Sequence, residues 1–126
     1  RDSALENPQD VYHYLTHKLR PYPYEVFSCL FFDNAHRFIH FEELFHGSIN
    51  EAAIYPRELI RQVYEHNAAA VILAHNHPSG IAEPSEADKR ITQEIKSILS
   101  AIDVRLLDHI IIGEGAITSF ASQGLL

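Results

Sequence analysis

The middle of the chain contains an uninterrupted apolar run, Ala-Ala-Ala-Val-Ile-Leu-Ala, at residues 68–74. A strand with one face in water alternates apolar and polar residues, whereas a strand covered on both faces is apolar throughout. This run therefore predicts a central β-strand buried on both faces of its sheet. Residues 75–84 contain two prolines and a glycine and predict a loop directly after it.

Helices and strands alternate on both sides of this run, with proline near the predicted helix starts and β-branched and aromatic runs in the predicted strands. Before the run we expect a helix from Asn7-Pro8 that Pro21 and Pro23 end, strands at 25–32 and 37–45 around a turn, and a helix from Pro56 to Asn67 with Leu59, Ile60, Val63 and Tyr64 on one face. After the run we expect a helix from Ser85 to about Ala101 and strands at 104–112 and 117–120. The fold class is therefore α/β, with a mixed β-sheet flanked by helices.

The length of 126 residues predicts a single domain, in which residues 1–7 form a frayed start without the apolar core of a signal peptide. Hydrophobic residues make up 46% and charged residues 21% of the chain, which excludes a disordered protein. No apolar run approaches the roughly 18 residues of a membrane helix. The single cysteine, Cys29, excludes an intramolecular disulfide and is expected to be buried. We therefore expect a cytoplasmic protein; its oligomeric state is left open.

The net charge is −7, because 10 Lys and Arg stand against 17 Asp and Glu, and the basic residues are scattered. Contact with phosphates requires clustered cations. Direct nucleic-acid binding by this domain is therefore not expected. The nine His are the unusual feature of the composition, because histidine is the commonest metal ligand.

His75 and His77 stand two residues apart, directly after the predicted central strand. Residues i and i+2 of an extended chain point to the same side, so both imidazoles can reach one point while Asn76 faces away. Asp88 lies in the first turn of the next predicted helix, and the intervening loop can return it to the strand end. Two His and one carboxylate leave the fourth position of a Zn²⁺ tetrahedron for water, as in catalytic zinc sites.

These residues also have ordinary structural explanations. Ser85 and Asp88 form the S-x-x-D pattern of a capping box, and histidine fills many polar roles besides metal binding. The combination of H-x-H at a strand end, Pro, and S-x-x-D at a helix start is nevertheless hard to obtain from packing alone. Capping and metal binding can coexist, but Asp88 cannot easily do both with the same oxygen.

The pattern H-x-H-P, six residues, then S-x-x-D resembles the JAMM motif of the JAB/MPN metalloproteases. The string His-Asn-His-Pro-Ser-Gly at 75–80 is similar to the RadC branch of that superfamily, as are the strings at 56–58, 68–74 and 107–113. The resemblance covers residues 25–126 and implies a three-layer, JAB/MPN-like fold similar to that of cytidine deaminases. RadC proteins usually also carry an N-terminal helix-hairpin-helix region, so we expect a fragment or a short family member.

The resemblance implies a role for each residue of the motif. His75, His77 and Asp88 match the three protein ligands of one zinc ion. Ser85 matches the serine whose hydroxyl helps to bind the oxyanion of a tetrahedral intermediate.

The superfamily also uses a glutamate from an early strand as general base, and Glu25 is the best match. Ser28 stands where many relatives have glycine. Glu42 and Glu43 on the second strand are the competitors for this role. Neighbouring residues of a strand point to opposite faces, so at most one of these two can reach a shared site.

These roles imply a metallopeptidase or isopeptidase-like hydrolase that cleaves an amide bond of a protein or peptide with water activated by zinc. The alternative is a RadC-like accessory protein of DNA repair or of mobile elements, whose metal site has another use or no catalytic use. A base deaminase is excluded, because its signature needs Glu two residues after His and a P-C-x-x-C segment, whereas position 77 is His. The intact motif residues argue against a non-catalytic module that has lost its metal, because such a module need not retain them.

The other histidines receive structural predictions. His109 follows Asp108 in an apolar strand and is expected in the core or behind a metal ligand rather than as a ligand itself. Surface or turn positions are expected for His13, His17, His36, His40, His46 and His66.

Overall fold

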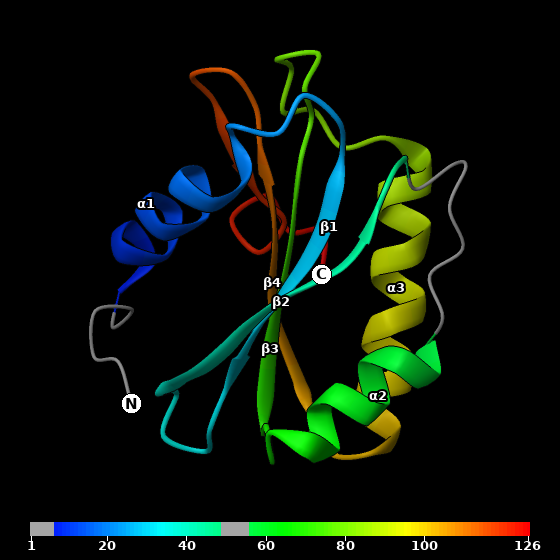
Figure 1. The fold of residues 1–126 in the computed structure, drawn as a ribbon. Helices are drawn as coiled ribbons and strands as arrows, with labels where there is room; N and C mark the ends of the chain where they lie inside the picture. Colours follow the sequence, from blue (N-terminus) through cyan, green and yellow to red (C-terminus); the bar gives the residue numbers. More distant parts are fainter. Residues whose placement is uncertain (1–6, 49–55) are drawn as a thin grey trace.

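In the computed structural model, which describes residues 7–48 and 56–126, five strands form one mixed sheet between helices (Figure 1). The elements are α1 (Pro8–Leu19), β1 (Val26–Phe32), β2 (Phe38–His46), α2 (Pro56–Glu65), β3 (Ala70–Asn76), α3 (Glu86–Ala101), β4 (Arg105–Ile112) and β5 (Ile117–Ser119). α1 packs on one face of the sheet, and α2 and α3 pack on the other. The predicted α/β class and three-layer arrangement are confirmed.

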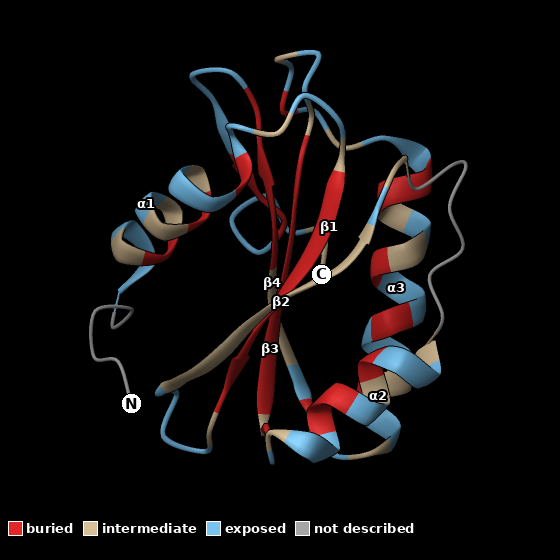
Figure 2. Cartoon of the chain, in the orientation of Figure 1, coloured by how far each residue is buried: buried red, intermediate tan, exposed pale blue. Residues whose placement is uncertain are grey.

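The sheet has the strand order β2-β1-β3-β4-β5, so β3 is its central strand. β1 pairs with both β2 and β3 in antiparallel fashion, whereas β3 and β4 are parallel and are joined through α3. All seven residues of β3 and of β1 are buried (Figure 2). The apolar run therefore does form the doubly covered centre of the sheet.

The central strand runs two residues further than predicted, because Ala70–Asn76 rather than 68–74 is extended. His75 and Asn76 were expected in the following loop. Both stay in the strand because they still pair with neighbours, His75 with Phe27 of β1 and Asn76 with Ile112 of β4. These two polar side chains can be buried there because each forms hydrogen bonds with other groups inside the protein.

The Asn76 side chain joins β3 to the start of β1. Its Oδ1 accepts a hydrogen bond from the Val26 N–H at 2.7 Å, and its Nδ2 donates to the carbonyls of Tyr24 at 2.9 Å and Tyr22 at 3.4 Å. The amide thus satisfies three backbone groups of the segment that leads into β1. These hydrogen bonds hold the backbone on both sides of Glu25, which lies between Tyr24 and Val26.

Two residues of the helical segments differ from the predictions, and α2 ends at Glu65 instead of Asn67. Asn7 was expected in a frayed start, but its side chain caps α1 by accepting from the Asp10 N–H; residues 1–6 lie outside the described residues. Tyr64 was expected on the buried face of α2 and is instead 69% exposed. Leu59 and Val63 set the buried face, and Tyr64 lies about 100° further round the helix.

No helix in 7–48 or 56–126 combines the length and the apolarity that crossing a membrane requires.

The loop after β3 is held against the turn between β4 and β5. The His77 N–H donates to the Ile112 carbonyl, and the Glu114 N–H donates to the Gly80 carbonyl, each at 2.9 Å. A Cβ on Gly113 would lie only 2.7 Å from the Gly80 carbonyl oxygen and 3.0 Å from the Ala82 nitrogen. Glycine at 113 is therefore required for this close approach.

Replacing Gly113 tests this packing. We expect Gly113→Ala to lower the free energy of unfolding by about 2 kcal/mol, because the methyl group would meet backbone that must shift. Gly115→Ala is the matched control: it has φ +72° but nothing within 4 Å of the added carbon, so it should cost only about 1 kcal/mol of backbone strain. Urea denaturation measures both, and equal losses would contradict the steric role of Gly113.

Candidate metal centre

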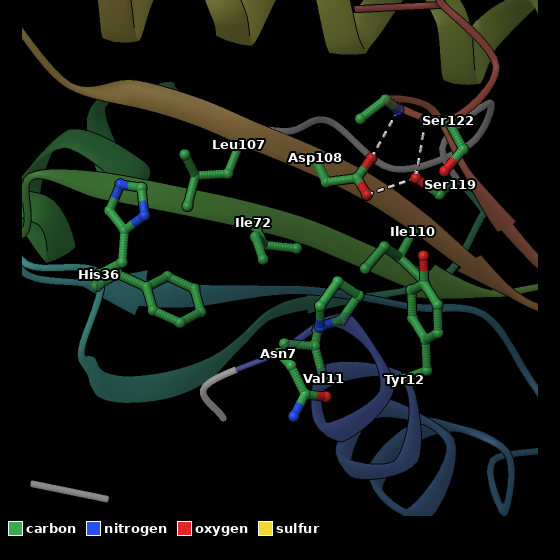
Figure 3. A pocket seen from close by; sticks show the side chains of 13 residues that line it. Asn7, Val11, Tyr12, His36, Ile72, Leu107, Asp108, Ile110, Ser119 and Ser122 are labelled. Carbon is green, nitrogen blue, oxygen red and sulfur yellow. Dashed lines mark hydrogen bonds between the residues drawn. The ribbon is translucent and has the colours of Figure 1, made fainter. Parts of the chain in front are cut away.

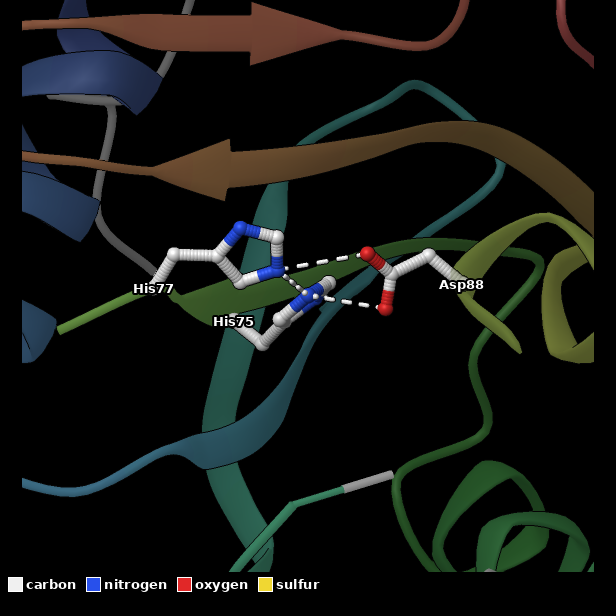
Figure 4. A group of neighbouring side chains, drawn as sticks. All are labelled: His75, His77 and Asp88. Atoms are coloured by element: carbon white, nitrogen blue, oxygen red, sulfur yellow. Dashed lines mark hydrogen bonds and ion pairs between the residues drawn. The ribbon is translucent and has the colours of Figure 1, made fainter. Parts of the chain in front are cut away.

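The imidazoles of His75 and His77 meet at the carboxyl end of β3 (Figure 4). Their Nε2 atoms lie 3.0 Å apart. Asn76, between them, turns its side chain away towards β1. The predicted same-side geometry of the H-x-H pair is therefore present in the structure.

Asp88 completes the group from the first turn of α3. Its Oδ1 lies 3.2 Å from Nε2 of His75, and its Oδ2 lies 3.2 Å from Nε2 of His77. The side chains of Asp88 and His75 are almost fully buried, and that of His77 is 13% exposed. Water or a ligand can therefore approach the group from the His77 side.

These three side chains fit a small divalent cation. One ligand atom from each lies within 4.8 Å of the others. A tetrahedral shell with bonds of about 2.0–2.1 Å separates neighbouring ligand atoms by about 3.3 Å. The observed separations of 3.0 and 3.2 Å are close to that value.

The hydrogen bond behind His77 orients its ring as a metal ligand. Nδ1 of His77 lies 2.9 Å from the carbonyl oxygen of Ile81. A carbonyl only accepts, so the ring hydrogen is on Nδ1 and neutral His77 presents the Nε2 lone pair. This lone pair points towards His75 and Asp88, where a cation would be bound.

Ser85 and Asp88 also form a complete capping box at the start of α3. The Ser85 hydroxyl accepts from the Asp88 N–H at 3.0 Å, and the Ser85 N–H donates to Asp88 Oδ2 at 2.8 Å. Oδ1 of Asp88 does not take part in the cap. The carboxylate therefore divides the two tasks between its oxygens, with Oδ1 towards His75 as the available ligand atom.

The charges in the group influence one another. Burial alone would raise the pKa of Asp88, but hydrogen bonds from the protonated imidazoles of His75 and His77 and from the Ser85 N–H outweigh it and hold the pKa well below its usual range. The hydrogen bond with Asp88 raises the pKa of His77, and the charge of Glu25 adds a smaller effect in the same direction. Asp88 is thus ionised, as a ligand must be.

Glu25 directly precedes β1, the strand that pairs with His75. Phe27 pairs with His75, and continuing this antiparallel register by two residues places Glu25 opposite His77. Were the alternation of β1 to continue to Glu25, the side chain would share the face of Phe27. The charge of Glu25 contributes to raising the pKa of His77. Glu25 is half-buried.

The two competing glutamates are engaged elsewhere. Glu42 is paired with His40 at 2.7 Å, whereas Glu43 accepts from the Tyr22 hydroxyl at 2.7 Å and contacts His46. Their cross-strand partners, Cys29 and Ser28, lie on opposite faces of β1, as expected for neighbours in a strand. Of the three glutamates, Glu25 is the one whose charge contributes to raising the pKa of His77.

Two residues behind His75 complete the polar interior. His109, on β4, lies with Nε2 2.9 Å from Nδ1 of His75 and with Nδ1 2.6 Å from Oγ1 of Thr92 on α3. Burial lowers the pKa of His109 well below its usual value. The expectation of a place in the core behind a ligand is confirmed for His109. Thr92 was missed, although its position four residues after Asp88 would have placed it on the same helix face.

The remaining predictions about single residues are mostly confirmed. Cys29 is fully buried, which raises the pKa of its thiol well above the usual value. His13, His17, His36 and His46 are exposed. His40 and His66 are half-buried instead, because their rings stack on each other with centroids 4.1 Å apart.

A hollow of about 340 Å³ lies on the other face of the sheet, beside α1 (Figure 3). Its walls are largely apolar, with Tyr12 and Ile72 among them. The carboxylate at its edge, Asp108, already accepts from the Ser119 hydroxyl and from the N–H groups of His109 and Ala121. Asp108 therefore anchors β5 to β4 and is not available as a second reactive group.

Comparison with known proteins agrees with this geometry. The family model described as RadC-like JAB domain matches residues 5–125. A UPF0758 protein of Nitrosococcus oceani is 58% identical over 126 residues, which are all of this chain and 56% of that protein. A UPF0758 protein of Stenotrophomonas maltophilia is 60% identical over 125 residues, which are 99% of this chain and 53% of that protein.

The chain thus spans about half the length of the curated relatives that it matches. Their names state no activity. The family match, however, extends over the sheet, α3 and all three members of the His-His-Asp group. The chain therefore belongs to the RadC family of JAB domains.

Proposed function

We propose that this domain is a JAMM-type zinc hydrolase that cleaves an amide bond of a protein or peptide. The observation that carries the proposal is the convergence of two imidazole Nε2 atoms and one ionised carboxylate at the end of the central strand. The JAB superfamily has metal-dependent hydrolases among its members. Metallopeptidase and isopeptidase-like reactions are the two forms that the proposal covers.

Zinc is the proposed ion, with His75, His77 and Asp88 as its ligands. Two imidazoles and one carboxylate leave one position of a tetrahedron open, as in catalytic zinc sites. A bound ion would lower the pKa of a water molecule to about 7 and polarise the carbonyl of the substrate.

Glu25 is the proposed general base. Two findings support this role: continuing the register of β1 and β3 would bring Glu25 opposite His77, and the charge of Glu25 raises the pKa of His77. Glu25 is not a member of the ligand group. It can take the proton from the attacking water and pass it to the leaving amine. A separate base lets the carboxylate of Asp88 remain a ligand and a cap throughout the reaction.

Ser85 is the proposed donor to the developing oxyanion. Its hydroxyl oxygen accepts from the Asp88 N–H, which leaves the hydroxyl hydrogen to be donated. The capping bond fixes the position of this oxygen relative to Asp88. A donor fixed in advance stabilises charge that develops in the transition state.

A role as an accessory protein of DNA repair or of mobile elements is the alternative. The net charge of −7 makes direct binding of duplex DNA by this domain a poor second candidate. A protein or peptide substrate is therefore the proposed partner.

Metal binding is tested first. We expect the double substitution His75→Ala, His77→Ala to abolish retention of zinc after incubation with the ion and gel filtration, because two of three ligands are lost. The double substitution His40→Ala, His66→Ala removes a pair of adjacent imidazoles outside the His-His-Asp group and is the matched control, with zinc retained. Elemental analysis of the protein fraction gives the stoichiometry. Equal zinc content in both variants would refute the ligand assignment.

The general base is tested by Glu25→Gln, which keeps shape and hydrogen bonding but removes basicity. We expect zinc to be retained and cleavage of a fluorogenic peptide and isopeptide library to fall by about 10²-fold or more. Glu42→Gln and Glu43→Gln should leave cleavage unchanged. Loss of cleavage in one of these two variants, with activity preserved in Glu25→Gln, would show that the base was assigned wrongly.

The two roles of Ser85 are separated by a comparison of caps. Ser85→Ala should lower the free energy of unfolding by about 1 kcal/mol through the lost cap and slow cleavage by about 10²-fold through the lost donor. Asn7→Ala removes the cap of α1 and should cost similar stability without slowing cleavage. Thermal unfolding and initial rates give both quantities. Unchanged cleavage by Ser85→Ala would leave Ser85 as a cap only.

A further inference from the structure

The interior behind His75 contains a continuous chain of hydrogen bonds that starts and ends at the candidate ligands. Thr92 Oγ1 lies 2.6 Å from the backbone carbonyl of Asp88 and 2.6 Å from Nδ1 of His109. Nε2 of His109 lies 2.9 Å from Nδ1 of His75. Thr92, His109 and His75 are all buried, so water does not supply other partners.

The direction of each hydrogen bond in this chain is determined by counting hydrogens. The carbonyl of Asp88 only accepts, so the single hydroxyl hydrogen of Thr92 is donated to it. The contact between Thr92 Oγ1 and His109 Nδ1 then needs a hydrogen of its own, which only His109 can supply. His109 therefore carries its hydrogen on Nδ1.

The tautomer of His109 determines which ring nitrogen of His75 carries the hydrogen. Its ring is fully buried, stacks on Phe120 with centroids 4.6 Å apart, and meets Phe27 edge-on. A charged imidazole is disfavoured in such surroundings, so the ring carries one hydrogen and its Nε2 can only accept. The hydrogen between the two rings is then on Nδ1 of His75. When His75 is neutral, its Nε2 is therefore a lone pair, and the 3.2 Å contact of this atom with Asp88 Oδ1 is not a hydrogen bond in that state.

We infer that Thr92 and His109 are positioning residues that fix His75 in the one tautomer able to bind a metal through Nε2. The inference deepens the proposed function, since it rests on His75 as a ligand. His77 receives the same tautomer from the Ile81 carbonyl. When both rings are neutral and fixed in this way, their Nε2 lone pairs lie 3.0 Å apart and each lies 3.2 Å from an oxygen of the Asp88 carboxylate. A bound cation stabilises this arrangement, and a proton takes its place when no cation is bound. Outer partners of metal-binding histidines generally act in this way.

Two substitutions of Thr92 test the inference and separate it from packing. Thr92→Val keeps the shape and the buried methyl group but removes the hydroxyl, which frees His109 and then His75 to adopt the other tautomer. Thr92→Ser keeps the hydroxyl and loses the methyl group. We expect Thr92→Val to weaken zinc binding by about 10–100-fold, and Thr92→Ser to bind close to the unchanged chain. A role in packing alone predicts the reverse order.

Zinc affinity is measured by competition with a chromophoric chelator, after circular dichroism has shown that each variant is folded. Nitrogen NMR of the imidazoles in metal-free protein at alkaline pH reads the tautomer itself: hydrogen on Nδ1 of His75 in the unchanged chain and in Thr92→Ser, and on Nε2 in Thr92→Val. If Thr92→Val does not fold, His109→Gln, which keeps an acceptor for His75, is compared with His109→Leu, which does not.

Tight zinc binding by Thr92→Val, equal losses in both Thr92 variants, or hydrogen on Nε2 of His75 in the unchanged chain would overturn the inference. In the His109 pair, equal zinc affinity would do so. These readouts need no substrate. A chain that shows the expected tautomers and affinities but cleaves no peptide would refute the hydrolase proposal and leave this inference standing.

Discussion

The structure depends on the cost of burying polar groups at the end of β3. An apolar strand can lie between two layers without further conditions, but His75 and Asn76 are 1% and 2% exposed, and every donor and acceptor on them needs a partner inside the protein. Asn76 finds its partners in the backbone that leads into β1, and His75 finds His109 on β4. The same requirement thus ties the central strand to both neighbours at the place where the ligands converge.

Three residues of β4 and the turn after it show how one strand can serve the site in separate ways. Asp108 holds β5 through the Ser119 hydroxyl, His109 contacts His75, and Gly113 makes room for the loop that carries Gly80 and Ala82. Asp108 and His109 are neighbours in β4 and point to opposite faces of the sheet, whereas Gly113 follows the end of the strand. The segment at 107–113 is therefore understood as structural support for a candidate metal site whose side chains come from the end of β3, the residue that follows it, and α3.

The order of elements and the meeting of His75, His77 and Asp88 could be predicted from the sequence, because apolar runs, proline positions and the period of a strand depend on neighbouring residues only. Tertiary partners decided the rest. The strand end moved from residue 74 to 76 because β1 and β4 extend to pair with it. Tyr64 was misjudged because the neighbouring layer decides which helix residues are buried. Thr92 was missed because no local pattern shows that it would meet His109.

Asp88 shows why a capping box and a metal site can share a residue without weakening each other. The Ser85 N–H donates a hydrogen bond to Oδ2 of Asp88. The N-terminus of α3 also stabilises the negative charge of the carboxylate, as helix N-termini do for anions. The side chain is thereby fixed in its rotamer and ionised before any cation binds. His75 and His77 are held in the same manner by His109 and the Ile81 carbonyl. A cation would therefore meet three side chains that need little further ordering, and the stability of the helix start would contribute directly to its binding.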